Sequence, residues 1–331
     1  MEAVPEKLHE LSPLGQYVYS FAKKYNVIDF SLNYLNTEPE KELDFLFGSR
    51  LYDFCLCFLF AFMMPFIRKF LVKRIYEPLG MRILGRQGEI SPKTLSKWTE
   101  SCWKLTGFTT FSTLAFFVSY GEVWFTDSRY WWLGCTHFPP CNLPVSRGLL
   151  LYYCFETGFY MEAINFLIFH ETRRRDWAES LIHHIATSIL LLYSYYVNFT
   201  RVGVVVLLIH DFSDIFLEAS KLAKYARAEI LSVALFVVFL ISWIVCRCVI
   251  FPLFVIRSTL FEPVALVAVH IGVEPRPHFE IFNCLLILLF ILHIYWTWII
   301  IKILLRLLVT GNADDVREKE EVEETKVVKE E

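Results

Sequence analysis

Seven long apolar stretches constrain this 331-residue chain more than any other feature of its sequence. Each is close to the length of about 20 mostly apolar residues that an α-helix needs to cross a membrane. The chain is 55% hydrophobic, whereas a soluble domain usually contains about 45–50% apolar residues. An all-α, polytopic membrane protein is therefore predicted. The predicted spans are 51–71, 104–125, 148–169, 178–197, 201–218, 229–256 and 280–305.

Lysine and arginine residues alternate between the loops that join these spans. The segment between the first two spans is rich in both, whereas loop 126–147 contains only Arg129 and Arg147. Because basic residues in short loops favour the cytosolic side, the alternation predicts a lumenal N-terminus and a cytosolic C-terminus. The basic residues flank the spans and form no soluble basic face, so no nucleic-acid partner is expected.

The chain divides into four segments on this basis. They are a lumenal, amphipathic segment (1–50), the first span with its cytosolic linker (51–94), a block of six spans (95–310) and a charged cytosolic tail (311–331).

Two loops have a character of their own. Loop 126–147 contains Trp, Tyr and Pro, which suggests an ordered lumenal cap, and its Cys135 and Cys141 are candidates for a disulfide in an oxidising lumen. Segment 258–279 is partly apolar and interrupted by proline, so we expect a loop that dips back toward the membrane.

Ionisable side chains lie inside the two consecutive spans 178–197 and 201–218. Such groups are costly in lipid, so they indicate a functional site by default. Residues three, four and seven apart share one face of a helix, and both spans show such a polar stripe. The first stripe is Asp176, His183 and Thr187, bordered by Ser180 and His184; the second is His210, Asp214, Glu218 and Lys221, with Asp211 beside it.

The two stripes are expected to meet at a similar depth. The short turn at 198–201 predicts antiparallel neighbouring helices. His183 would lie about 9 Å and His210 about 12 Å from the same membrane face, at the rise of an α-helix. Two helices that line a shared cavity are therefore predicted, with a candidate catalytic set of His183, His184, His210, Asp211 and Asp214.

Other polar residues within the spans have simpler interpretations. His293 in the last span fits an interhelical hydrogen bond as well as it fits a function. Glu156, Glu162 and Asn165 are interpreted as structural, and Arg247 as an arginine that snorkels or pairs with a carboxylate.

The candidate set favours acid–base or nucleophilic acyl chemistry. A histidine oriented by a carboxylate is suited to that work. The single HH and single HD pairs are too few for the His-rich boxes of di-iron membrane enzymes, and no GxSxG motif is present. A single zinc ion held by His and Asp stays an alternative that nothing in the sequence favours, so no metal or other cofactor is expected.

At these residues the chain resembles the longevity-assurance ceramide synthases of the TLC-domain superfamily. The resemblance rests on Arg175-Asp176, on His183-His184 with Thr187, and on SYYVNFTRVG at 194–203 and VLLIHDFSDIFLEASKLAKY at 206–225. Weaker matches are LSKWTESCWK at 95–104, YYCFETGFY at 152–160 and IFPLFVI at 250–256.

The resemblance implies a fold, an activity and a location. The implied fold has about seven transmembrane helices, six of them ringed around a central cavity that opens to the cytosol. The implied activity is transfer of a fatty acyl group from acyl-CoA to the amine of a sphingoid base, in the endoplasmic reticulum membrane. Acyl-CoA, the sphingoid base and membrane lipids are then the expected partners, and an oligomer with a copy, a related synthase or a small regulatory membrane subunit is left open.

The resemblance also implies roles for individual residues. His183 would accept the acyl group or activate the amine, with His184 in support and His210 alongside. Asp211 and Asp214 would orient the imidazoles and accept the ammonium group of the base. Cations around the cytosolic mouth would hold the CoA phosphates; they are Arg173, Arg174, Arg175, Lys221, Lys224 and Arg227.

Two alternatives belong to other functional classes. One is a non-enzymatic TLC-domain protein that senses lipids or assists translocation, and the full HH and HDxxD set argues against it. The other is a transporter that couples the same His and Asp residues to protons or metal ions. Acyl chain length, the choice of sphingoid base and regulation of the tail are not encoded in any pattern that we can interpret.

Overall fold

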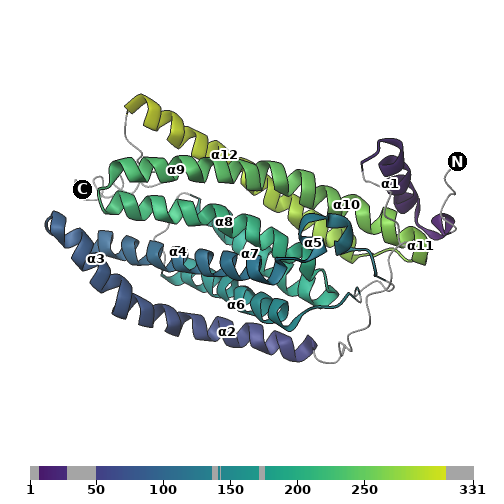
Figure 1. Ribbon diagram of the computed structural model, residues 1–331, viewed down its shortest axis with the longest axis horizontal. Coiled ribbons are helices and arrows are strands. Elements are labelled where there is room, and N and C mark those ends of the chain that lie inside the picture. Colours follow the sequence, from purple (N-terminus) through teal and green to yellow (C-terminus); the bar gives the residue numbers. More distant parts are fainter. Residues whose placement is uncertain (1–6, 28–49, 136–140, 142, 171–175, 311–331) are drawn as a thin grey trace, which may run out of the picture.

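The computed structural model describes residues 7–27, 50–135, 141, 143–170 and 176–310. All regular structure in these ranges is helical, which confirms the predicted all-α class. The long helices run roughly side by side along the long axis of the molecule (Figure 1). They are α2 (Arg50–Leu71), α4 (Pro92–Ser119), α6 (Arg147–Phe169), α7 (Trp177–Val197), α8 (Thr200–Tyr225), α9 (Glu229–Trp243) and α12 (His278–Thr310).

Two of these helices continue well beyond the predicted spans. α2 passes through the π-helix η3 (Val72–Tyr76) into α3 (Glu77–Leu84), so much of the expected linker is helical. α9 passes through a long π-helix, η6 (Ile244–Ile256), and then through three further short helices. These are α10 (Arg257–Glu262), η7 (Pro263–Ala268) and α11 (Val269–Ile271).

The prediction of a loop from residue 258 onward is therefore wrong as far as residue 271. Pro263 follows α10 directly without ending the helix, which continues through η7 and α11 as far as Ile271. The side chains from Val264 to Val269 are buried, which explains their apolar character without a return into the lipid.

Within the described residues, three helical stretches are both long and apolar enough to cross a membrane by composition alone. They are Asp53–Leu84, Glu229–Ile271 and His278–Val309. The helices α4, α6, α7 and α8 contain more polar residues, including the predicted site, and are not among these three stretches.

Six of the long helices form a closed sequence of neighbours in space, in which each helix packs against the next and the last packs against the first. α4 packs against α6, α6 against α7, and α7 against α12. The sequence continues from α12 to η6 and α9, then to α8, and from α8 back to α4. The helices α7 and α8, although joined by a short turn, therefore have their main neighbours elsewhere, which differs from the predicted side-by-side pair.

α2 packs against α6, and α6 carries a glycine, Gly158, in its contact with α2. A Cβ atom on Gly158 would lie 2.6 Å from the Cβ atom of Phe60 and 2.7 Å from the backbone nitrogen of Ala61. Farther along the same pair, Arg68 of α2 and Glu162 of α6 form an ion pair of 3.1 Å. Both contacts hold α2 against the six-helix arrangement.

Smaller elements cover one end of the molecule. α1 (Pro13–Lys24) lies beside α10 and α11 at the end opposite α3 (Figure 1). The carboxylate of Glu274 accepts hydrogen bonds from the backbone and the hydroxyl of Ser12, which caps α1. α5 (Val123–Thr126) and, from loop 126–147, η5 (Ser128–Trp131) lie in the same region, and η5 is in keeping with the predicted ordered cap.

Candidate functional site

A cavity of about 340 Å³ lies among the six neighbouring helices. Residues from α4, α6, α7, α8, α9, η6 and α12 line it. The polar stripes predicted on α7 and α8 both contribute residues to its wall. The stripe residues in this wall are Asp176, Ser180, His183, His184, Asp214, Glu218 and Lys221.

A second, smaller cavity of about 60 Å³ adjoins the first. Its wall is mostly apolar and includes Trp132, Phe199 and Phe282, together with Thr187 and His210 from the two stripes. His183 and Tyr160 line both cavities and therefore stand where the two meet. A long ligand that occupied both spaces would pass these two side chains.

His183 and His184 lie next to each other on α7 and have different neighbours. Their ring centroids are 5.6 Å apart. The His183 ring meets Trp296 of α12 edge to face at 5.3 Å, whereas the His184 ring lies 6.4 Å from the Tyr160 ring. The Nδ1 atoms of both histidines are buried without a hydrogen-bond partner among the described residues. No carboxylate therefore orients either imidazole through Nδ1 in this structure.

Asp211 is completely buried and is held by a tyrosine. The Tyr160 hydroxyl on α6 donates a hydrogen bond of 2.6 Å to Asp211 Oδ1. Glu156, also completely buried, is an electrostatic neighbour of Asp211 and of Tyr152. The expected contact between Asp211 and an imidazole is replaced by this contact to Tyr160.

Asp214 is held by an arginine from the π-helix η6. Arg247 Nη2 lies 2.8 Å from Asp214 Oδ2 and also donates to the backbone carbonyl of His210 at 2.9 Å. Arg247 Nε donates to Ser213 Oγ at 3.3 Å, and its guanidinium lies over the Trp243 ring at 4.1 Å. The prediction that Arg247 pairs with a carboxylate is confirmed, and Asp214 has no hydrogen bond to a histidine ring among the described residues.

His210 is joined to a residue that the sequence did not assign to the site. Its Nε2 atom lies 3.0 Å from Nε2 of His293 on α12, and its Nδ1 atom lies 2.6 Å from the carbonyl oxygen of Val206. The interpretation of His293 as an interhelical hydrogen-bond partner is thus confirmed. A histidine inside an apolar span was the sequence feature that singled out His293, but the sequence of that span does not indicate that its partner is His210.

Cationic side chains form part of the wall of the larger cavity. Lys104, Lys221 and Lys224 line it, and Lys221 pairs with Glu218 at 2.7 Å. Arg227 follows the end of α8 with a positive φ of 51°. The predicted cations Arg173, Arg174 and Arg175 lie outside the described residues. No cluster of three or more His, Cys, Asp or Glu side chains in the described ranges could hold a metal ion.

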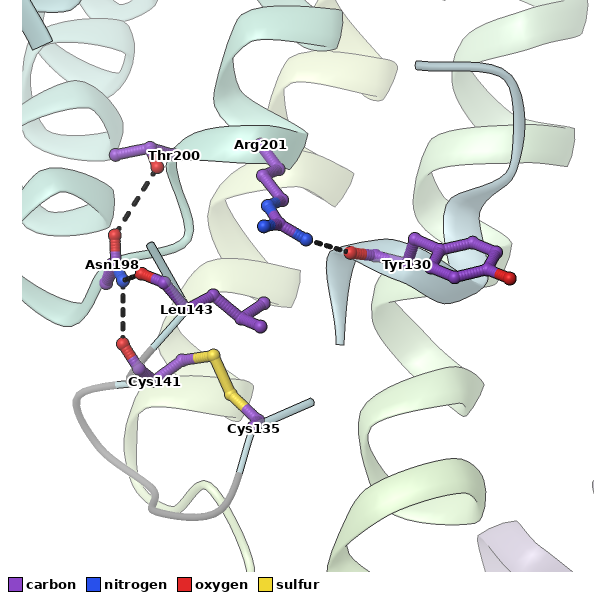
Figure 2. Close-up of a disulfide and its surroundings, with 7 residues drawn as sticks. All are labelled: Tyr130, Cys135, Cys141, Leu143, Asn198, Thr200 and Arg201. Atoms are coloured by element: carbon purple, nitrogen blue, oxygen red, sulfur yellow. Dashed lines mark hydrogen bonds between the residues drawn. A yellow bond between two sulfur atoms is a disulfide. The ribbon is translucent and has the colours of Figure 1, made fainter. Parts of the chain in front are cut away.

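The turn between α7 and α8 is fastened to the disulfide loop. Cys135 and Cys141 form a disulfide (Figure 2). Asn198, which ends α7 in the left-handed conformation, donates from Nδ2 to the carbonyls of Cys141 and Leu143 at 2.7 Å each. Arg201 at the start of α8 donates to the carbonyl of Tyr130 at 2.7 Å. These bonds fix where both site helices begin or end.

Comparison with known proteins places this site in a family. The model of the TLC domain matches residues 97–302. ASC1-like protein 1 of Oryza sativa subsp. japonica is 36% identical over 286 residues, which cover 82% of this chain and 91% of the relative. Ceramide synthase 1 LOH3 of Arabidopsis thaliana is 35% identical over 287 residues, covering 82% and 92%.

The chain belongs to the ceramide synthase family of TLC-domain proteins. The family extends to an animal relative, ceramide synthase 5 of Mus musculus, which is 35% identical over 217 residues, or 66% of this chain and 50% of that protein. The matched TLC domain contains both stripes, every lining residue of the two cavities except Ile303, and the His210–His293 pair, whereas α2 and α3 precede it.

Proposed function

We propose that this member of the ceramide synthase family transfers a fatty acyl group from acyl-CoA to the amine of a sphingoid base. The observation that carries the proposal is the position of His183, where an apolar cavity meets a larger cavity with cationic side chains. The relatives named ceramide synthase in plants and mouse support the same activity.

We propose that all seven long helices cross the membrane. The four more polar helices have 21 to 28 residues, hence lengths of about 31 to 42 Å, against a hydrocarbon core of about 30 Å. The location is the endoplasmic reticulum, with the N-terminus in the lumen and the C-terminus in the cytosol. The Lys and Arg residues between the first two spans support this orientation.

The two parts of acyl-CoA match the two cavities in polarity. The acyl chain partitions into apolar space, whereas CoA is charged and stays near water. In the proposed arrangement the CoA phosphates lie near Lys221, Lys224 and Arg227, and the thioester reaches His183. The apolar cavity beyond His183 excludes water from the reacting carbonyl.

The reaction forms one C–N bond and breaks one C–S bond. The amine nitrogen, once deprotonated, attacks the thioester carbonyl; CoA leaves as the thiolate and takes up a proton. Two routes fit the placement of His183. It either removes the proton from the amine during direct attack, or it first accepts the acyl group on a ring nitrogen and passes it to the amine.

The carboxylates have roles that follow from their partners. Asp214 lies in the wall of the larger cavity, where it can accept the ammonium group of the sphingoid base before deprotonation. Asp211 is completely buried, so it acts through Tyr160, the residue that lines both cavities beside His183.

The test is N-acylation of sphinganine by the purified protein in lipid nanodiscs, with acyl-CoAs of different chain lengths. We expect product from the native protein and a loss of at least about 100-fold in the His183→Ala/His184→Ala variant. Intact-mass analysis after exposure to acyl-CoA alone separates the two routes, because only the acyl-enzyme route gives an adduct that depends on His183. Folded native protein that forms no product from any acyl-CoA would overturn the proposal and favour lipid sensing or transport.

A further inference from the structure

The contact between His210 and His293 joins two helices that are not direct neighbours in the closed sequence of six. His210 is on α8 and His293 on α12, and η6 packs against both helices. The two Nε2 atoms are 3.0 Å apart, within hydrogen-bond distance. His293 is completely buried and His210 is 5% exposed, so water does not compete for this bond.

The partners of the two rings determine where the protons lie. The carbonyl oxygen of Val206 can only accept a hydrogen bond, so His210 must carry its proton on Nδ1. A neutral His210 then has a lone pair on Nε2, and His293 must donate its Nε2 proton to it. His293 Nδ1 is left as a buried acceptor without a partner among the described residues.

Aromatic side chains enclose the pair. The Phe251 ring of η6 meets both imidazoles edge to face, the His210 ring at 5.2 Å and the His293 ring at 5.0 Å. The Trp243 ring lies 6.1 Å from the His293 ring. A hydrogen bond in such low-dielectric surroundings is stronger than one in water, and its loss would leave the Nε2 atom of His210 without a partner among the described residues.

Both ring nitrogens of His210 thus form hydrogen bonds within the protein, although the ring lines the smaller cavity. Arg247 holds the His210 carbonyl from the other side and continues to Asp214. The position of the His210 ring is linked in this way to the carboxylate that faces the larger cavity.

We propose that His293 is a positioning residue for acyl transfer, which by donating to His210 Nε2 holds His210 as a fixed part of the cavity wall. On this account His210 neither removes the substrate proton nor carries the acyl group, and those tasks belong to His183 and His184. The kinetic part of this inference rests on the proposed function.

The kinetic test compares His293→Gln with His293→Leu in the N-acylation assay. Leucine fills the space without a donor, and we expect kcat to fall about 5- to 150-fold, the range for a buried acceptor that loses its donor. KM for acyl-CoA should stay within about twofold, because His293 lines neither cavity. Glutamine restores an N–H donor, and we expect it to regain most of kcat.

His278→Leu is the matched control on the same helix. This variant loses the hydrogen bond between His278 and Tyr193, but His278 has no described contact with His210, so near-native kcat is expected. A His293→Leu variant with native kcat, or a His293→Gln variant as impaired as His293→Leu, would overturn the positioning role.

A spectroscopic test does not depend on activity. Solid-state NMR of the native protein in bilayers, with ¹⁵N-labelled histidine, should show a through-hydrogen-bond correlation between the two Nε2 nitrogens and a proton on Nδ1 of His210. Comparison with the His293→Leu variant assigns these signals, because the His293 signals should disappear and the His210 signals should shift. A His210 ring that carries its proton on Nε2, or no correlation to His293, refutes the inference even in protein that shows no acyl transfer.

Discussion

Replacing Asn198 should destabilise the protein through the turn that joins the two site helices. Asn198 is 5% exposed and has a φ of 61°, in the left-handed region. Its amide group donates to two buried backbone carbonyls, those of Cys141 and Leu143. The side chain and the backbone conformation therefore contribute separately, and two substitutions separate them.

Asn198→Gly keeps the left-handed backbone accessible and removes both donated hydrogen bonds. At about 1 kcal/mol each, their loss should lower the free energy of unfolding by about 2 kcal/mol. Asn198→Ala loses the same bonds and adds about 1–2 kcal/mol for an L-residue in the left-handed conformation. The expected order of stability is native, then Gly, then Ala.

The assay is unfolding in mixed micelles with increasing SDS, followed by tryptophan fluorescence. The matched control is Asn26, an exposed asparagine after α1 with a φ of 49° and no side-chain hydrogen bond that the structure describes. Asn26→Gly should stay within about 0.5 kcal/mol of the native protein. In a Cys135→Ser/Cys141→Ser background, the penalty for Asn198→Gly should shrink, because the carbonyl acceptors are then less firmly held.

Native-like stability of Asn198→Gly would refute the reasoning, since it would show that the two hydrogen bonds contribute nothing to the turn. An equal loss in Asn26→Gly would refute it in another way, by attributing the effect to asparagine in the left-handed region alone.

Two further predictions concern α6. Gly158→Ala should lower the free energy of unfolding by about 1–3 kcal/mol in the same assay, because the new Cβ atom would press against the backbone of α2. Gly148→Ala is the control, because its Cβ atom would have its nearest neighbour 3.8 Å away, and equal effects of the two substitutions would contradict the packing argument. Tyr160→Phe removes the donor to Asp211 and should lower kcat for N-acylation by about 5- to 150-fold, whereas unchanged turnover would show that Asp211 does not act through Tyr160.

Hydropathy was sufficient to locate the long helices, because a lipid environment demands about 20 apolar residues per crossing. Hydropathy gave a wrong prediction where apolar side chains are buried against other parts of the protein and not in lipid. Residues 258–271 look like a proline-broken loop, but their apolar side chains are buried by neighbouring elements and the helix continues. Composition alone does not distinguish a segment that is buried in protein from one that returns to the membrane.

Helical periodicity predicted that one face of α7 and one face of α8 line a cavity, and residues of both faces lie in the walls of the two cavities. It did not predict what these faces meet, because the spacing along one helix contains no information about the side chains of another. Asp211 was expected to orient a histidine and instead contacts Tyr160, which lies 51 positions away in the sequence. His210 and His293 are 83 positions apart and meet through the arrangement of six helices.

The bonds of Asn198 have a consequence for the maturation of the chain. Asn198, Phe199 and Thr200 form an acceptor sequence for N-glycosylation, in which a sugar is attached to the asparagine Nδ2 atom. In the folded protein that atom is buried and donates to Cys141 and Leu143. With the turn on the lumenal side, as proposed, folding of the turn and attachment of a glycan would compete for this one nitrogen, and a glycan at Asn198 would identify chains in which the sugar was attached before the turn folded.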